Sequence, residues 1–333
     1  MKKRKFAIEM GGGYTCIYVN GEGLALKEPT LVAVECSEEG YKVIAMGLEA
    51  KKMIGKTGDN IEIFTPVVYG ENSNYDYSVV LLRYFLDKVD FKPFIDNAIF
   101  IIPCGITADE KEKILNVCDG VELGDVELVP SVICSCLGAG RNVDNSKANL
   151  VVDIGGFCTD VAVVNMSGVL KGATVGVGGK GIDASIVNYL ACTQGILIGL
   201  STAEILKNEV GSLYANDTLN MEVTGVDVSS KTPKSMLVVS KDLINPIEPF
   251  YNEIVRVVET TVNTLPPEII EDVINNKVLI VGGCAKMQGL DNYLKKHLDF
   301  PVEFAEDLEN STILGAGKLL SDTNLLDNIV KNL

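Results

Sequence analysis

Hydrophobic and polar residues follow two different periods along this chain, and the changes between them divide it into strands and helices. Residues 6–10, 15–19 and 31–36 are short apolar runs separated by turn residues, which predicts three strands joined as an antiparallel meander. Helical spacing follows at 48–54 and 79–89, and the apolar run 98–102 predicts a strand buried on both faces. Thr107 and Glu110 have the spacing of a capping box, so we expect a helix to begin there.

The second half of the chain has a similar order of elements. Strands are expected at 149–153 and 161–165, on either side of a glycine turn, and helices near 182–191, 202–210 and 245–264. A strand at 277–281 and a helix at 290–297 follow. Because strands and helices alternate, the pattern predicts an α/β fold.

The two halves share a glycine motif. Residues 9–15 and 153–159 both contain an acidic residue, an apolar residue, two glycines, two further residues and a threonine, each motif lying between two apolar strands. Asp153 follows Glu9 by 144 residues. Two similar hairpins nearly half a chain apart indicate a duplicated domain whose halves face each other across a cleft.

Each glycine hairpin has the chemistry of a phosphate site. Successive backbone N–H groups attract anions, and without a Cβ the chain can approach a phosphate closely. A nucleotide also needs Mg²⁺, which proteins hold largely through waters with one or two carboxylates. The two copies together therefore predict paired phosphate loops, although a single glycine turn is more often a plain connector.

Two further segments carry weaker signals. Residues 278–285 run from a strand through Gly282 and Gly283 toward a helix, which suits either a flat ligand close to the backbone or a simple tight turn. Glu204 and Lys207 are three residues apart on a predicted helix and so share a face. Without further context, that pair is equally an ion pair in solvent.

Composition excludes several classes of function. The chain has 333 residues, of which 47% are hydrophobic and 22% charged, and this predicts about two folded domains. A formal net charge of −16 disfavours nonspecific binding to phosphate backbones, so no nucleic-acid partner is expected. The single histidine, His297, lies in a polar run, which argues against a Ser/His or Cys/His catalytic pair.

The cysteines and the N-terminus indicate the compartment. The nine cysteines include no C-x-x-C pair and lie mostly in apolar segments, which favours free thiols in a reducing cytosol. Glu9 and the glycines after it interrupt any signal-peptide core, and no apolar run is long enough to cross a bilayer. We therefore expect a cytoplasmic protein.

Several further segments follow in a recognisable order through nearly the whole chain, at residues 23–34, 82–85, 102–107, 151–156, 177–179, 202–207 and 281–285. Through these segments the sequence resembles the MreB family of bacterial cell-shape proteins in the actin superfamily. This resemblance implies an actin-like (ribonuclease H-like) α/β fold, duplicated into two lobes and four subdomains around a cleft for ATP and Mg²⁺. The expected lobes are residues 1–146, with a small insertion near 32–76, and residues 147–333, with one near 183–244.

The resemblance also assigns roles to residues. Glu9 and Asp153 would hold Mg²⁺ through water, with Asp153 also on the catalytic side. The residues expected to contact the nucleotide are Gly11, Gly12, Gly13, Thr15, Gly155, Gly156, Phe157, Thr159, Gly178, Gly179, Glu204, Lys207, Gly282 and Gly283.

Three positions depart from the family pattern. Glu9 stands where the family has the shorter Asp, which shifts the carboxylate toward the metal's water shell. Phe157 and Cys158 replace a glycine and a threonine, so Phe157 would be strained if its backbone needs a positive φ, and its ring would crowd the γ-phosphate. Ser131 occupies the place of the Glu that orients the attacking water, and a hydroxyl is a poor base. Slow or absent ATP hydrolysis is therefore predicted.

The function implied by the resemblance is that of a filament subunit. Nucleotide would close the lobes, and closed subunits would join head to tail, with copies of this chain or with another MreB-like subunit. The expected place is the inner face of the cell membrane, beside membrane proteins of cell-wall synthesis. The candidate lipid contacts are the basic residues Lys2, Lys3, Arg4 and Lys5 together with Phe91 and Phe94.

Three alternatives stay open at this point. An actin-fold kinase for a sugar or acetate would need a substrate pocket and a catalytic base. A chaperone-type ATPase would need a substrate-binding domain after the core. A degenerate scaffold would keep the fold, bind no nucleotide and copolymerise with a true MreB.

Overall fold

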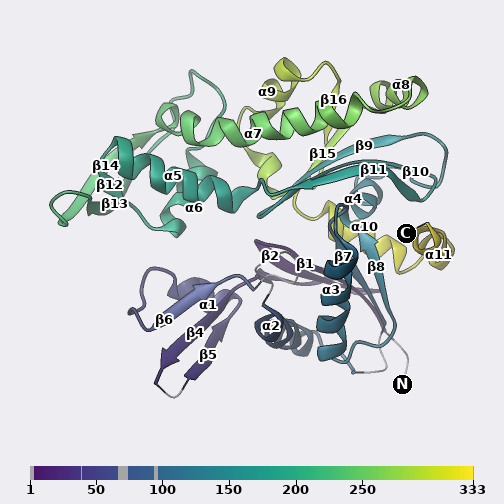
Figure 1. Cartoon of the computed structure of the whole chain (residues 1–333), viewed down its shortest axis with the longest axis horizontal. Helices are drawn as coiled ribbons and strands as arrows, with labels where there is room; N and C mark the ends of the chain where they lie inside the picture. The colour runs from purple at the N-terminus through teal and green to yellow at the C-terminus, as the bar shows by residue number, and fades with distance from the viewer. Residues whose placement is uncertain (1–3, 39, 67–73, 94–96, 333) are drawn as a thin grey trace.

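Two five-stranded sheets of the same topology form the centre of the molecule (Figure 1). The structure, a computed structural model, describes residues 4–38, 40–66, 74–93 and 97–332. The strand orders are β3-β2-β1-β7-β8 and β11-β10-β9-β15-β16. In each sheet the central strand pairs antiparallel with the next strand in the chain and parallel with a strand that follows one or more helices. The predicted duplication is confirmed.

The first lobe is built around the first sheet. Its elements are β1 (Lys5–Met10), β2 (Tyr14–Val19), β3 (Gly23–Pro29), α2 (Tyr75–Lys88), β7 (Asn97–Ile102), α3 (Ala108–Gly120), β8 (Val126–Pro130) and α4 (Ser131–Gly138). A small sheet projects from it, made of β4 (Val32–Ser37), β5 (Gly40–Met46) and β6 (Ile61–Phe64), with α1 (Leu48–Met53) beside it.

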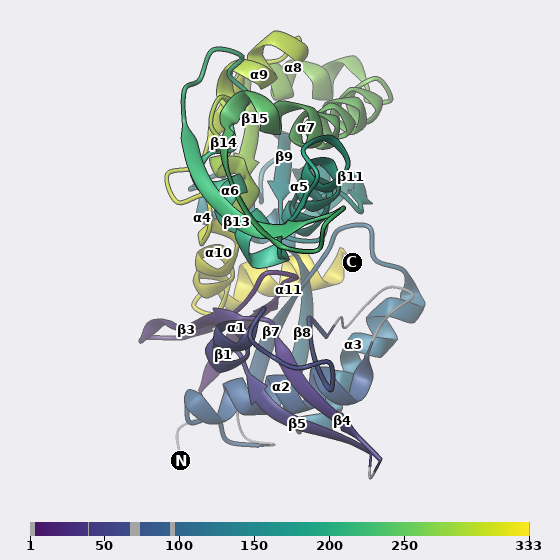
Figure 2. The same cartoon turned by 90° about the vertical axis from the view of Figure 1, so that its left-hand side faces the viewer.

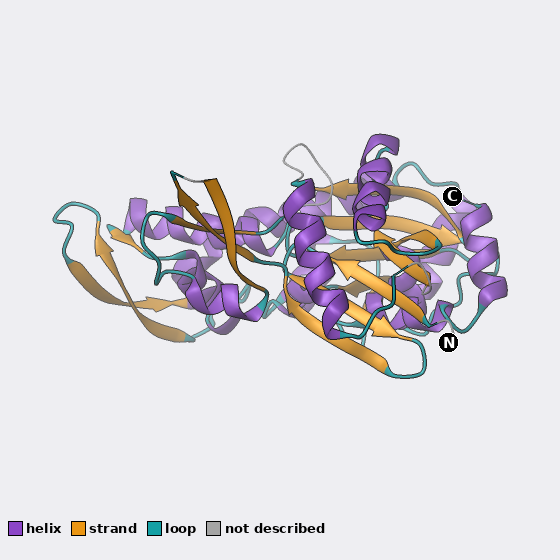
Figure 3. Ribbon diagram, turned by 90° about the horizontal axis from the view of Figure 1, so that it is seen from below, coloured by secondary structure: helices purple, strands orange, loops and turns teal. Residues whose placement is uncertain are grey.

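The second lobe is built around the second sheet. Its elements are β9 (Asn149–Ile154), β10 (Thr159–Asn165), β11 (Gly168–Val175), α5 (Gly179–Thr193), α6 (Leu200–Glu209), α7 (Ser240–Val262), α8 (Pro267–Asn276), β15 (Val278–Val281), the 3₁₀ turn η1 (Gly283–Lys286), α9 (Leu290–His297) and β16 (Val302–Phe304). Its small sheet contains β12 (Ile196–Leu197), β13 (Asn220–Asp227) and β14 (Pro233–Val239). The chain ends with α10 (Ser311–Leu319) and α11 (Thr323–Lys331). Figure 3 shows both small sheets at the end of the molecule away from the termini.

Side chains alternate between two cores along the central strands. On β1, Phe6 and Ile8 pack in the core that contains α2 and α3, whereas Ala7 packs in a core shared by α4, α10 and both sheets. Viewed from the side of the small sheets, the lobes stand one above the other, with α10 and α11 at their junction (Figure 2).

Two glycines allow α4 and α10 to cross closely at this junction. A Cβ at Gly138 would lie 1.8 Å from the Ser311 carbonyl oxygen, and a Cβ at Gly315 would lie 1.8 Å from that of Cys134. Because both obstacles are backbone atoms, only glycine fits at these positions. The crossing fixes how the two sheets face each other.

Most predicted elements are present, and Thr107 caps α3 with the expected capping box. The third strand of the first meander was wrong: residues 32–37 form β4 of the small sheet, and β3 pairs with β2 instead. β3, β11, β13 and β14 were not predicted, because each mixes polar and apolar residues and is largely exposed on one or both faces.

Of the two phenylalanines predicted to contact lipid, only Phe91 lies in the described part of the chain. Phe91 is buried, and its ring meets that of Phe6 edge-on at 5.5 Å between centroids, so it is not exposed to lipid. Phe94, Lys2 and Lys3 lie outside the described residues. Arg4 forms an ion pair with Glu22 at 2.9 Å, and Lys5 donates to the Leu320 carbonyl at 3.3 Å. None of the helices in the described part of the chain is long and apolar enough to cross a membrane.

Candidate functional site

A cavity of about 480 Å³ lies between the lobes, and both glycine hairpins line it. This volume is in the range of small-molecule sites, about 300–1,000 Å³. The predicted site residues in its wall are Glu9, Gly11, Gly12, Gly13, Ser131, Asp153, Gly155, Gly156, Phe157, Gly179, Glu204, Lys207, Gly282 and Gly283. The structure therefore brings most of the predicted site together.

Three predicted site residues lie behind this wall. Thr15 is buried, and its hydroxyl is 3.0 Å from that of Thr30. Thr159 is also buried and donates a hydrogen bond to the Val177 carbonyl at 2.7 Å. Gly178 lies against the second hairpin, since a Cβ there would be 2.6 Å from the Gly156 carbonyl oxygen. These residues brace the hairpins from outside the cavity.

The two hairpins have the same local geometry. The Gly11 N–H donates to the Tyr14 carbonyl at 3.0 Å, and the Gly155 N–H donates to the Cys158 carbonyl at 2.9 Å. Neither glycine has a positive φ. Glycine is needed here for close approach, because a Cβ at Gly155 would lie 2.9 Å from the Cys158 carbonyl oxygen.

Phe157 does not have the backbone strain considered above. Its φ is not positive, so its backbone does not need glycine. The ring instead lies against Gly12 of the opposite hairpin, where a Cβ would be 2.1 Å from Cδ2 of Phe157.

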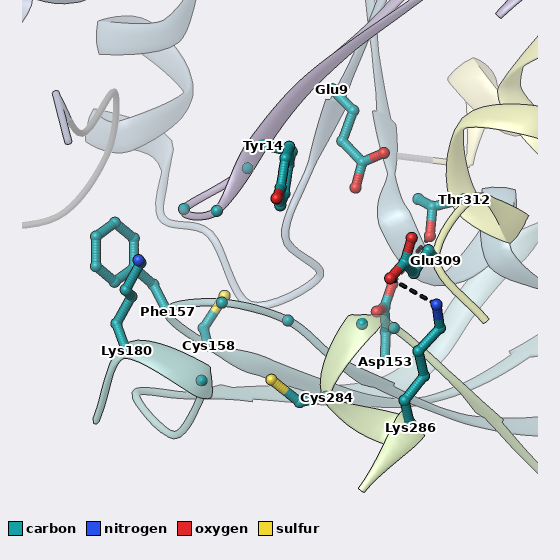
Figure 4. Close-up of a pocket in the computed structure, with 18 of the residues that line it drawn as sticks. Glu9, Tyr14, Asp153, Phe157, Cys158, Lys180, Cys284, Lys286, Glu309 and Thr312 are labelled. Atoms are coloured by element: carbon teal, nitrogen blue, oxygen red, sulfur yellow. Dashed lines mark hydrogen bonds and ion pairs between the residues drawn. The ribbon is translucent and has the colours of Figure 1, made fainter. Parts of the chain in front are cut away.

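Two carboxylates point into the cavity from opposite lobes, Glu9 from β1 and Asp153 from β9 (Figure 4). Asp153 accepts hydrogen bonds from the hydroxyls of Ser135 at 3.0 Å and Thr312 at 3.2 Å. Burial, and then the charge of Asp160, raise the pKa of Asp153 to about 6. Burial, and then the charge of Asp153, raise the pKa of Glu9 to about 8. The buried environment of the cavity therefore disfavours the ionised form of both side chains.

The donor set fits a hydrated divalent cation. Among the described residues, no lysine or arginine forms an ion pair with Glu9 or Asp153. The described residues also contain no cluster of three or more His, Cys, Asp or Glu side chains that would ligate a metal directly. Two facing carboxylates without a cationic partner match the way Mg²⁺ is bound, through water and substrate phosphates.

Ser131 forms a hydrogen bond with a further carboxylate of the site, Asp160. It begins α4, and its hydroxyl donates to Asp160 Oδ2 at 2.7 Å. Asp160 is buried on β10 and also accepts from the Thr174 hydroxyl and from the Cys104 N–H at 3.3 Å. The Ser131 proton is thus already shared with Asp160.

Lys207 has a structural partner on the nucleoside side predicted for the cavity. Its Nζ lies 2.7 Å from Asp183 Oδ1 and donates to the Gly179 carbonyl at 3.1 Å. The contact with Asp183 has ion-pair distance without hydrogen-bond alignment. The two side chains are 9% and 2% exposed. Lys207 therefore supports Gly179 from within the protein.

Two ion pairs connect the lobes around the cavity. Lys51 of α1 lies 3.4 Å from Glu204 of α6. Lys27 of β3 lies 2.9 Å from Glu309, which also binds Lys286 at 2.7 Å (Figure 4). These pairs are contacts between the lobes in the arrangement seen here.

Comparison with known proteins agrees with this architecture. Residues 3–328 match the family described as MreB/Mbl protein. The chain belongs to the MreB/Mbl family. It is 31% identical over 326 residues to the cell shape-determining protein MreB of Escherichia coli (strain K12), covering 96% of this chain and 94% of that protein. It is 30% identical over 330 residues to the cell shape-determining protein Mbl of Bacillus subtilis (strain 168), covering 98% of each.

Solved structures confirm the actin-like fold of this MreB/Mbl chain. MreB 5 of Spiroplasma citri bound to AMPPNP superposes with a TM-score of 0.90 at 26% identity, covering 100% of both chains. The MamK double helical filament has a TM-score of 0.78 at 18% identity, covering 96% of this chain and 99% of that chain, and shows the fold alone.

Several residues of this MreB/Mbl site were missed by sequence reasoning. Asp160 directly follows the second glycine motif, and that position was one available signal. Lys286 directly follows the segment 278–285, which was a second such signal. The others lie outside the motifs and reach the cavity through the fold: Asp183, Glu309 and Thr312.

Proposed function

We propose that this chain is a nucleotide-dependent filament subunit, which binds ATP with Mg²⁺ between its lobes and guides cell shape and cell-wall synthesis. The observation that carries the proposal is the pair of equivalent glycine hairpins on one cavity, with Glu9 and Asp153 facing each other beside them. Relatives support it: MreB 5 of Spiroplasma citri has been solved with AMPPNP and with ADP.

In this proposal the backbone N–H groups of the two hairpins bind the phosphates, with Phe157 beside them. Thr15 and Thr159 hold the hairpin strands in place. Glu9 and Asp153 bind waters of the Mg²⁺ shell, and Mg²⁺, when bound, neutralises phosphate charge. The nucleoside side is formed by Gly179, Glu204, Lys207, Gly282 and Gly283, and Gly178 supports the second hairpin behind it.

Gly282 shows why glycine suits that side of the cavity. Its φ is 95°, and a Cβ would lie 2.3 Å from the Ile154 carbonyl oxygen. The backbone of η1 thus comes directly against the end of β9, which a side chain would prevent.

Hydrolysis is proposed to be slow in this site. The Ser131 hydroxyl donates its proton to Asp160, so its oxygen can accept a hydrogen bond from a water but is a poor base. Loss of a positioned base typically lowers a rate by about 10²–10⁴-fold.

Assembly is proposed to follow from lobe closure. The closing units are the lobes 1–146 and 147–333, with the insertions 32–76 and 183–244 on either side of the cavity mouth. A head-to-tail contact between closed subunits is heterologous and generates an open polymer. The proposed partners are further copies of this chain or another MreB-like subunit, at the inner face of the cell membrane beside membrane proteins of cell-wall synthesis. The proposed location is cytoplasmic and peripheral to the membrane.

High-speed sedimentation tests this proposal directly. The purified protein is pelleted with Mg-ATP and without nucleotide, in solution and on liposomes, and nucleotide binding is measured by calorimetry. Asp153→Asn should lose nucleotide-dependent pelleting, whereas Asp299→Asn, on an exposed aspartate, should retain it.

The alternatives predict different results. Pelleting that is absent or indifferent to nucleotide, together with no binding, would contradict the proposal and favour a degenerate scaffold that needs a second MreB-like subunit. ADP production that depends on an added sugar or acetate would indicate a small-molecule kinase instead.

A further inference from the structure

Phe157 joins the tips of the two glycine hairpins. Its ring belongs to the second lobe and covers Gly12 of the first, where a Cβ would lie 2.1 Å from Cδ2 and 2.5 Å from Cγ. The backbones meet beside it, since a Cβ at Gly156 would be 2.9 Å from the Gly13 nitrogen. An aromatic ring therefore fills the space between the hairpin tips, at the wall of the cavity.

We propose that Phe157 sets the nucleotide-state specificity of this protein, by closing the hairpins almost equally well on a nucleoside diphosphate and on a triphosphate. The inference rests on the proposed function, because it requires the cavity to bind a nucleoside polyphosphate. It adds that the γ-phosphate is nearly dispensable for closure.

The argument concerns differential affinity. A ligand shifts an equilibrium between open and closed forms only by the difference in its affinity for them. A terminal phosphate favours the closed form when it accepts hydrogen bonds from both hairpins at once, which a diphosphate cannot reach. Here the Phe157 ring already connects the two hairpins by apolar contact. The additional bridge made by a γ-phosphate therefore changes the equilibrium between open and closed forms little.

The ring does not make nucleotide unnecessary. Glu9 and Asp153 point into the same cavity from opposite lobes, and no lysine or arginine of the described residues forms an ion pair with either, so closure brings together two carboxyl groups that lack a counter-charge. A cation bound with the phosphates supplies that charge, whether two or three phosphates are present. We therefore expect closure to require a nucleotide with Mg²⁺, and to differ little between the diphosphate and the triphosphate.

Phe250 provides a matched control. Its ring also covers a glycine, since a Cβ at Gly181 would lie 2.8 Å from Cε1 of Phe250. Both partners belong to the second lobe, on α7 and α5, so this contact does not bridge the lobes. Replacing Phe250 tests the general effect of removing a phenyl ring that packs against a glycine, without a contact between the lobes.

The experiment compares dissociation constants for Mg-ADP and Mg-AMPPNP in the full chain by calorimetry, with pelleting in parallel. The wild type and Phe250→Ala should bind the two within about threefold and pellet with either. Phe157→Gly and Phe157→Ala should prefer AMPPNP by about tenfold or more, within the usual range of coupling, and pellet only with it.

A second measurement uses the absence of tryptophan from the chain. Phe157→Trp places a single fluorophore between the hairpins, and its emission should shift on nucleotide binding by the same amount with ADP and AMPPNP.

The outcomes separate the two proposals. A wild type that binds neither nucleotide overturns the proposed function and this inference together. A wild type that binds both, but with a tenfold preference for AMPPNP, overturns the inference alone. So does a ratio that Phe157→Gly and Phe157→Ala leave unchanged, or a fluorescence shift in the Phe157→Trp variant that differs between ADP and AMPPNP.

Discussion

The buried ion pair between Lys207 and Asp183 allows a quantitative test of the site. Lys207→Met keeps an unbranched apolar stem of similar length but removes the charged ammonium group. Asp183, 2% exposed, then keeps a buried carboxylate without its cation, and the Gly179 carbonyl loses its donor. Because both side chains are less than a tenth exposed, solvent screens the pair little. Breaking such a pair typically costs about 3–5 kcal/mol of unfolding free energy.

The pH dependence of this loss has a definite sign. Burial raises the pKa of Asp183 above its usual value, and Lys207 opposes that rise. In Lys207→Met the pKa rises further, so the folded state binds a proton more tightly than the unfolded chain does. A group with a raised pKa in the folded state stabilises the protein below its unfolded pKa and loses that contribution as pH rises. The destabilisation should therefore be larger at pH 8 than at pH 5.

Urea unfolding followed by circular dichroism measures the effect. Lys207→Met should lower the free energy of unfolding at pH 8 by about 3 kcal/mol or more, and the added change Asp183→Asn should recover much of it. The control Lys52→Met breaks an exposed pair with Glu49 and should change stability by less than about 1 kcal/mol. A loss below about 1 kcal/mol in Lys207→Met, or a double variant no more stable than the single one, would refute the reasoning.

Three further predictions concern the carboxylates, the catalytic position and the lobe junction. Burial raises the pKa of Asp153 from 3.8 to about 6 and that of Glu9 from 4.5 to about 8, so the unfolding free energy of the nucleotide-free protein should fall as pH rises from about 4 to about 8. A slope between about pH 4 and 6 that Asp153→Asn leaves unchanged would contradict this. Ser131→Glu should raise phosphate release from ATP by about tenfold or more while Ser131→Ala stays near wild type, and equal rates in all three would exclude the proposed role of this position. Gly315→Ala places a Cβ 1.8 Å from the Cys134 carbonyl oxygen and should lower the free energy of unfolding by about 1–3 kcal/mol. Thermal unfolding measures this change, and an unchanged melting temperature would mean that α4 and α10 can move apart without cost.

The sequence was most informative where neighbours along the chain decide the structure. The capping box at Thr107, the buried strand β7 and the two glycine hairpins depend on residues within a few positions of one another. The same locality explains the errors. The strand predicted at 31–36 is present as β4 at 32–37, but the sheet assigned to it was wrong. β4 pairs with β5 and β6, and those partners lie outside the strand's own sequence.

The identity of the cavity was also largely present in the sequence. Fourteen of the predicted site residues line one cavity. Eight of them lie in the repeated motif, which marks equivalent turns in two copies of one fold, and the other six were assigned by the family resemblance. The repeat predicted that Glu9 and Asp153 have equivalent roles, because they occupy the same position in its two copies. In the structure each lies near the end of the central strand of its sheet.

Only the tertiary structure decided what those residues contact. Ser131 donates to Asp160, Lys207 to Gly179, and Phe157 lies on Gly12, and each contact joins segments that no local pattern relates. The sequence by itself thus determined an α/β fold with two similar halves facing a cleft, through short-range periodicity and repetition, and it indicated the family through a resemblance that runs along nearly the whole chain. The state of the side chains within the cleft followed from packing across the lobes, since burial and partner charges depend on the atoms that surround a group in space.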